Sequence, residues 1–144
     1  MKPYLLDTNV LIALAWPNHV HHAPAAEWFG RRAASAFCTC PITQTGFVRI
    51  SSNPSFNTSA VGPAEALALL DRITRLPGHR FWPDDLAAGE AFAPWPLLAT
   101  HRQVTDGYLL ALAHAHDGIL ATLDRGILTL ARKFHDRLEL VDSN

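Results

Sequence analysis

The chain has 144 residues, of which 49% are hydrophobic and 17% charged, and its formal net charge is −1. This length predicts one domain spanning residues 1–144, because single domains cluster around ~100–150 residues. The apolar fraction excludes disorder, and no apolar run reaches the ~20 residues of a membrane helix. The near-zero charge excludes a strongly basic protein that coats nucleic acid. Two cysteines, Cys38 and Cys40, are too few for a disulfide scaffold, and a cytoplasmic location is expected.

The first half of the chain alternates short strands with helices. Tyr4 to Leu6 is a short apolar run that ends at Asp7, which indicates a buried strand feeding a helix. Pro24 is expected to open a second helix as its first residue. In chain order the pattern predicts a strand over 4–6, a helix over 10–15, a helix from 24, a strand over 36–40, a helix over 42–52 and a helix from 62.

The second half repeats this alternation. Thr105 is expected to cap a helix that runs to His116, and Gly118 ends it. Three prolines between 83 and 99 make the helix content of that stretch uncertain. Further strands are predicted over 79–82, 119–123 and 138–141, with a helix over 127–134. Strands alternating with helices predict an α/β fold with a mostly parallel sheet.

Three acidic residues fall where such a fold binds ligands. Asp7 and Asp124 each follow a buried strand, and Asp106 lies in the first turn of the helix before the Asp124 strand. The carboxyl ends of parallel strands form the binding crevice of an open α/β sheet. Converging carboxylates repel one another, and a divalent cation such as Mg²⁺ or Mn²⁺ relieves that repulsion. A capping or turn role is the competing interpretation for each residue taken singly.

The local sequences around these acids resemble those of the PIN-domain ribonucleases, and most closely the VapC toxins of bacterial type II toxin–antitoxin systems. The resemblance is carried, in the expected order along essentially the whole chain, by LLDTNVLIAL at 5–14, PITQTGFVRISSNP at 41–54, RQVTDGYLLALAHAHDGILATLD at 102–124 and LELV at 138–141.

This resemblance implies a three-layer α/β/α fold with a five-stranded, mostly parallel sheet. It implies endonucleolytic cleavage of RNA that depends on Mg²⁺ or Mn²⁺, with Asp7, Asp106 and Asp124 as metal ligands and catalytic residues. It also implies a cognate VapB-type antitoxin that restrains the enzyme, a toxin homodimer, and larger toxin–antitoxin assemblies.

One position departs from the family pattern. A fourth acidic residue, usually glutamate, aligns with Gln44, whose amide can bind a metal weakly but carries no charge. Natural drift, an inactivating substitution and an untypical subgroup are competing explanations. Gln44 is expected at the catalytic site, so Gln44→Glu is expected to raise activity. The alternative function is a catalytically impaired module that binds RNA or antitoxin without efficient cleavage.

Other side chains are candidates for binding RNA. Arg49 and Arg125 are expected to face the crevice and contact the substrate, with a structural salt bridge as the competing interpretation. The aromatic residues Trp16, Phe56 and Trp82 are candidates for stacking on unpaired bases, and a core role competes for Trp16. The histidines at 19, 21 and 22 are interpreted as a solvated loop at a helix start rather than a zinc site.

Overall fold

The computed structural model describes residues 1–56, 61–93, 100–133 and 135–141, and their strands form one parallel sheet. The strand order is β3-β2-β1-β4-β5, and each of the four pairings is parallel. The strands are β1 (Tyr4–Leu6), β2 (Phe37–Thr39), β3 (His79–Phe81), β4 (Ile119–Thr122) and β5 (Leu138–Leu140). The expected five-stranded sheet is confirmed, and within the described residues it is wholly parallel.

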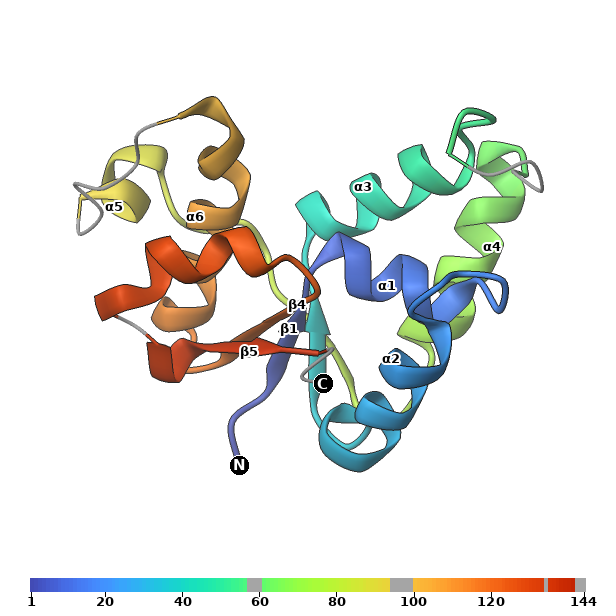
Figure 1. Cartoon of the computed structure of the whole chain (residues 1–144), viewed down its shortest axis with the longest axis horizontal. Coiled ribbons are helices and arrows are strands. Elements are labelled where there is room, and N and C mark those ends of the chain that lie inside the picture. Colours follow the sequence, from blue (N-terminus) through green and yellow to red (C-terminus); the bar gives the residue numbers. More distant parts are fainter. Residues whose placement is uncertain (57–60, 94–99, 134, 142–144) are drawn as a thin grey trace.

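Helices cover both faces of this sheet. The α-helices are α1 (Thr8–Ala15), α2 (His22–Trp28), α3 (Pro41–Ser51), α4 (Pro63–Thr74), α5 (Ala88–Phe92) and α6 (Val104–Ala115). A π-helical turn (Phe29–Ala33) extends α2, and 3₁₀ helices occupy His101–Gln103, Arg125–Lys133 and His135–Arg137. In Figure 1, α1 to α4 lie to one side of the sheet, and α5 and α6 lie to the other. The expected three-layer α/β/α architecture is confirmed.

Alternation along the strands divides the core in two. Tyr4 and Leu6 of β1 pack in the cluster that includes α1, α2 and α4, whereas Leu5 packs in the cluster that includes α6. Phe37 and Cys38 of β2 divide between the same two clusters. Successive side chains of a strand point to opposite faces, so a short apolar run with both faces buried supports two helical layers.

The order of the strands creates a switch point between β1 and β4. The chain passes from β1 to β2 and β3 on one side, and then returns to place β4 on the opposite side of β1. Leu6 is paired with Ala121, so β1 and β4 end at the same level. Ligands of open α/β sheets bind outside the carboxyl ends of the strands at such a point. The two strands that meet there are those followed by Asp7 and Asp124.

Several predicted element boundaries were wrong. Thr105 does not cap α6, because the 3₁₀ turn of residues 101–103 leads directly into the helix and Gln103 occupies the capping position. Helix α2 begins at His22, so Pro24 lies inside its first turn rather than at its start. The helix predicted over 127–134 is a 3₁₀ helix that begins two residues earlier, over Arg125–Lys133, and Phe134 lies outside the described residues. In the described part of the chain, no helix is long and apolar enough to cross a bilayer.

Candidate active site

Asp7 is held at the end of β1 by hydrogen bonds from both sides. It caps the N-terminus of α1: its Oδ1 accepts a hydrogen bond of 2.7 Å from the backbone N–H of Thr8. Its Oδ2 accepts a bond of 2.7 Å from the hydroxyl of Thr122. The side chain is almost fully buried. A carboxylate in this setting is stabilised by its donors but has a fixed orientation.

Thr122 and Asn9 tie the ends of β1 and β4 together. The Thr122 hydroxyl, while donating to Asp7, accepts hydrogen bonds from the Asn9 amide at 3.2 Å and from the backbone N–H of Asp124 at 3.1 Å. The Asn9 side chain also accepts from the backbone N–H of Leu123 at 3.1 Å. One hydroxyl and one amide therefore fix the positions of two aspartates that lie far apart in the sequence.

Asp124 and Asp106 reach the same region from different elements. Asp124 follows β4, is exposed, and its Oδ1 accepts a hydrogen bond of 2.8 Å from the backbone N–H of Gly126. Asp106 lies in the first turn of α6 and is half-buried. The expectation that the helix before β4 directs Asp106 toward the other two acids agrees with the structure, since all three interact electrostatically.

The charges of the three carboxylates disfavour one another. Burial and, to a lesser extent, the negative charges of Asp7 and Asp124 together raise the pKa of Asp106 to about 6. Burial also raises the pKa of Asp7, against the opposing effect of its bonds from Thr122 and Thr8, and the charge of Asp124 adds to the rise. Such mutual repulsion is relieved by a proton or by a cation.

The oxygen atoms around Asp7 are of the kind that bind a hard divalent cation. The aspartates supply carboxylate oxygens, Thr122 a hydroxyl and Asn9 an amide oxygen, the ligand types that Mg²⁺ and Mn²⁺ prefer. Within the described ranges, however, no three His, Cys, Asp or Glu side chains are close enough to ligate one ion together. Asp7, Asp106 and Asp124 are thus an acidic cluster close enough for electrostatic interaction, without a complete coordination sphere formed by side chains alone.

A cavity of about 440 Å³ opens at this acidic cluster. Asp7 and Asp106 line one part of it, and it continues along α1 past Ile12. Its complete lining is Asp7, Thr8, Asn9, Ile12, His19, Ile50, Asn53, Phe56 and Asp106. The participation of His19 could not be found from hydrophobic periodicity, because the turn after α1 sets its position.

The structure does not bring Gln44 into this cavity. Its amide nitrogen donates a hydrogen bond of 2.9 Å to the hydroxyl of Thr39, which lies 2.7 Å from His79 Nε2. Burial lowers the pKa of His79, against the opposing effect of a hydrogen bond with the Thr74 backbone. Gln44 lines cavities between α3 and α4 together with Leu67 and Leu70. Gln44 thus contacts Thr39 and faces α4, and it is not among the residues that line the acidic cavity. Its expected place at the catalytic site stays a prediction.

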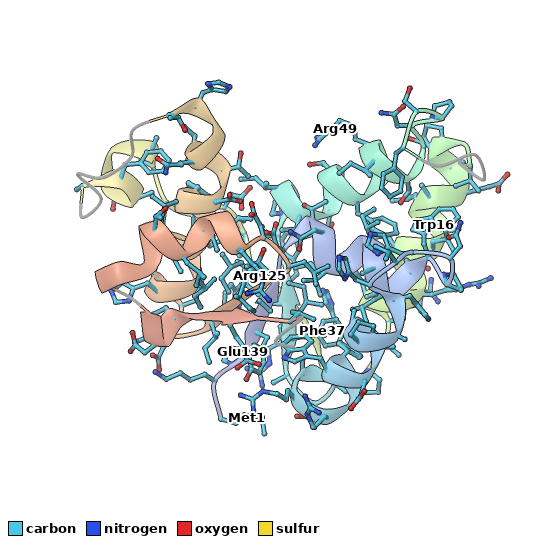
Figure 2. The ribbon with its side chains drawn as sticks, viewed as in Figure 1. Met1, Trp16, Phe37, Arg49, Arg125 and Glu139 are labelled. Atoms are coloured by element: carbon cyan, nitrogen blue, oxygen red, sulfur yellow. The ribbon has the colours of Figure 1, made fainter. Side chains whose placement is uncertain are left out.

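The two arginines expected to bind substrate lie far apart. Figure 2 shows Arg49 at the outer rim of α3 and Arg125 near the centre of the view, where β4 ends. Both side chains are exposed. Arg125 directly follows Asp124, whereas Arg49 lines a cavity on the α3–α4 side. Arg125 is therefore next to the acidic cluster through its chain neighbour Asp124, whereas Arg49 faces the α3–α4 side.

Comparisons with known proteins agree on one family. The model of the PIN domain family matches residues 4–133. Ribonuclease VapC39 of Mycobacterium tuberculosis is 48% identical over 128 residues, which cover 85% of this chain and 89% of that protein. Ribonuclease VapC38 of the same species is 45% identical over 129 residues, covering 90% of each chain.

Solved structures show the same fold. DNA-bound VapBC from Salmonella typhimurium superposes with a TM-score of 0.63 at 18% identity, covering 98% of this chain and 99% of that chain. FitAcB from Neisseria gonorrhoeae superposes with a TM-score of 0.61 at 22% identity, covering 89% and 92% of the two chains. At these identities the superpositions support the architecture alone.

Thr122 offers a test of the hydrogen-bonded frame. Thr122→Val removes the donor to the buried Asp7 carboxylate, and we expect it to lower the free energy of unfolding by about 1–3 kcal/mol. Thr122→Ser keeps the hydroxyl and is expected to lose much less. Chemical denaturation of the three proteins measures the difference. A larger loss in Thr122→Ser than in Thr122→Val would show that the methyl group contributes to stability and the hydroxyl does not.

The raised pKa of Asp106 predicts how the stability of the protein depends on pH. Its pKa is about 6 in the folded chain, above the ordinary 3.8, so the folded state binds this proton more tightly than the unfolded state. The resulting stabilisation is present at low pH and is lost as the pH rises through 6. Without metal, we expect the free energy of unfolding of the wild type to fall, relative to that of Asp106→Asn, as the pH rises from about 4 to about 6.

The comparison with the Asp106→Asn variant is essential, because two histidines change the stability with pH in the direction opposite to Asp106. Burial lowers the pKa values of His19 and His79, so their contributions to stability increase as the pH rises. Urea denaturation of wild type and Asp106→Asn over the same pH values separates these effects. A difference between the two proteins that does not change with pH would contradict the raised pKa of Asp106.

Proposed function

This chain belongs to the PIN-domain family and, within it, to the VapC ribonucleases, and we propose that Asp7, Asp106 and Asp124 form the centre at which it hydrolyses RNA. The protein is an endoribonuclease, the toxic component of a type II toxin–antitoxin system. The observation that carries the proposal is the meeting of three mutually repelling carboxylates at the β1/β4 switch point.

PIN-domain ribonucleases depend on divalent metal ions. We propose Mg²⁺ or Mn²⁺ here, because every donor in the cluster is an oxygen atom. Such an ion, when bound, supplies Lewis-acid activation of water and neutralises charge on the phosphate. Asp7, Asp106 and Asp124 would hold it, directly or through water.

The protein's own groups have distinct parts in this proposal. Asp7, held by hydrogen bonds from Thr8 and Thr122, presents its carboxylate in a fixed orientation. Asp106 lies in the first turn of α6, where the half-buried carboxylate completes the cluster. Asp124, the most exposed of the three acids, orients the attacking water from the solvent side. Arg125, next in the chain, contacts the RNA backbone.

We also propose the molecular setting of this reaction. The fold is shared with VapBC and FitAcB, which supports a VapB-type antitoxin as partner, together with a toxin homodimer and a larger toxin–antitoxin assembly. The acidic cavity is the surface at which such an antitoxin would block access of RNA. A single domain over residues 1–144 and a cytoplasmic location complete the proposal.

The alternative of a catalytically impaired binding module is not favoured. It depended on Gln44 as a substituted metal ligand, but Gln44 donates its hydrogen bond to Thr39 and lines cavities beside α4. An uncharged residue in that place removes no negative charge from the acidic cluster. The three carboxylates that interact are all present.

Single substitutions of the acids test the proposed centre. Asp7→Asn, Asp106→Asn and Asp124→Asn are each expected to reduce cleavage of single-stranded RNA by at least about 100-fold. Chelation by EDTA is expected to abolish cleavage by the wild type, and Mg²⁺ or Mn²⁺ to restore it. Glu90→Gln, on the exposed surface of α5, is the control. Full cleavage by Asp7→Asn, or in excess EDTA, would refute the proposal.

Gln44→Glu tests whether position 44 belongs to the centre. We expect unchanged cleavage and metal affinity, in contrast to the expectation from sequence, because Gln44 donates to Thr39 and does not line the acidic cavity. A carboxylate there cannot donate to the Thr39 hydroxyl, and we expect a loss of about 1 kcal/mol in unfolding free energy. Thr45→Glu, on the exposed side of α3, adds the same charge as a control. Higher activity in Gln44→Glu alone would place position 44 at the metal.

A further inference from the structure

The acidic cavity has a second end, formed by residues that the proposed chemistry does not use. His19, Asn53 and Phe56 line it together with Asp7 and Asp106. His19 and Phe56 also line an adjoining smaller cavity of about 160 Å³, with Trp16 and Asn18. The lining follows α1 for one to two helical turns, about 5–11 Å, beyond Asp7. An aromatic and polar recess therefore opens from the acidic cluster.

His19 is fixed in one tautomer. Its Nδ1 lies 3.0 Å from the backbone N–H of His21 and accepts that hydrogen bond. Burial and the neighbouring histidines 21 and 22 lower the pKa of His19, so the ring is neutral near pH 7. With Nδ1 as acceptor, the proton of the neutral ring is on Nε2. His19 thus offers one N–H donor from a ring held by the turn after α1.

Phe56 supplies an accessible aromatic face. It is 41% exposed, whereas Trp16 and Trp82 are buried at 9% and 8%. The Trp16 indole donates to Ser51 at 3.1 Å, and Trp82 stacks on His116. Of the three aromatic residues considered for stacking on bases, Phe56 is therefore the one whose ring is available.

A tight turn holds Phe56 in place at the end of α3. Its backbone N–H donates to the carbonyl of Asn53 at 3.0 Å, and the Asn53 side chain accepts from the backbone N–H of Ser55 at 2.9 Å. Because the Asn53 oxygen is engaged, its amide nitrogen is the group suited to donate into the cavity.

We propose that this recess binds an unpaired base of the RNA, next to the phosphate that is cleaved, by stacking on Phe56 and by a hydrogen bond from His19 Nε2–H. The inference rests on the proposed function. The recess presents a flat aromatic ring and neutral donors, which match the face and the acceptor edge of a base. It is continuous with the acidic cluster, so a nucleotide bound here belongs to the chain whose phosphate lies beside Asp7.

This arrangement selects single-stranded RNA. A base inside a duplex is stacked on its neighbours and cannot insert its face against Phe56, whereas an unpaired base can turn outward. Stacking accepts every base, and the single donor on His19 favours those with an acceptor on the facing edge. The recess thus contributes to the choice of cleavage site without contacting the reacting phosphate.

Fluorescence of 2-aminopurine tests the stacking directly. The probe is a single-stranded RNA dodecamer with one 2-aminopurine, in a set that moves it along the chain, bound to Asp7→Asn so that the RNA stays intact. We expect quenching at one position, its loss in Phe56→Ala, and its recovery in Phe56→Trp. Phe81→Ala removes another exposed phenylalanine, on β3, and is expected to leave quenching unchanged.

Cleavage kinetics with otherwise wild-type protein provide the second readout. Phe56→Ala is expected to raise KM about 10- to 100-fold, the worth of one stacked base, with kcat retained. An abasic nucleotide at the quenched position is expected to raise KM for the wild type and to have no further effect in Phe56→Ala. A purely structural role for Phe56 would not depend on the base.

Several results would overturn the proposal. Quenching at no position, or equal quenching in Phe56→Ala, would exclude stacking in the recess. Weaker capture of the antitoxin by Phe56→Ala, with RNA quenching unchanged, would assign the recess to the protein partner. If Asp7→Asn abolishes metal-dependent cleavage but Phe56→Ala changes neither quenching nor KM, base binding in the recess is refuted. The proposed function would then still stand.

Discussion

The carboxylate of Asp7, buried where β1 and β4 end side by side, is the group on which the site depends. Burial of a negative charge is unfavourable unless hydrogen-bond donors compensate it, and here the Thr8 backbone and the Thr122 hydroxyl do so in part. The same hydroxyl accepts a hydrogen bond from the backbone N–H of Asp124. Compensation of one buried charge therefore also positions the second acid, and the strand order makes this possible.

The third acid adds repulsion that the protein alone does not relieve. The pKa of Asp106 is raised to about 6 by burial and by its two acidic neighbours, so without a cation this carboxyl binds a proton more tightly than an ordinary aspartate does. The formal net charge of −1 conceals this concentration of negative charge. In the proposed function RNA, itself a polyanion, meets an acidic centre that must be neutralised before a phosphate can approach it. Dependence on a divalent cation follows from this electrostatic requirement.

Most of the fold, and the three acids, were predictable from sequence. Apolar runs that end at Asp7 and near Asp124 identify β1 and β4, because buried parallel strands lack alternation. The contacts of the Gln44 side chain with Thr39 and α4 were not predictable, since they depend on how α3 packs against α4. The place of His19 follows from a turn whose geometry is set by tertiary contacts. Thr105 failed as a cap because a 3₁₀ turn precedes α6.

A crystal structure with bound Mn²⁺, located by its anomalous scattering, tests the central claim most directly. The account predicts one strong peak within about 2.0–2.4 Å of an Asp7 oxygen, with Asp106 or Asp124 completing the shell directly or through water, and Gln44 still bonded to Thr39. A peak elsewhere, for instance among the histidines at 19, 21 and 22, with none beside Asp7, would contradict it.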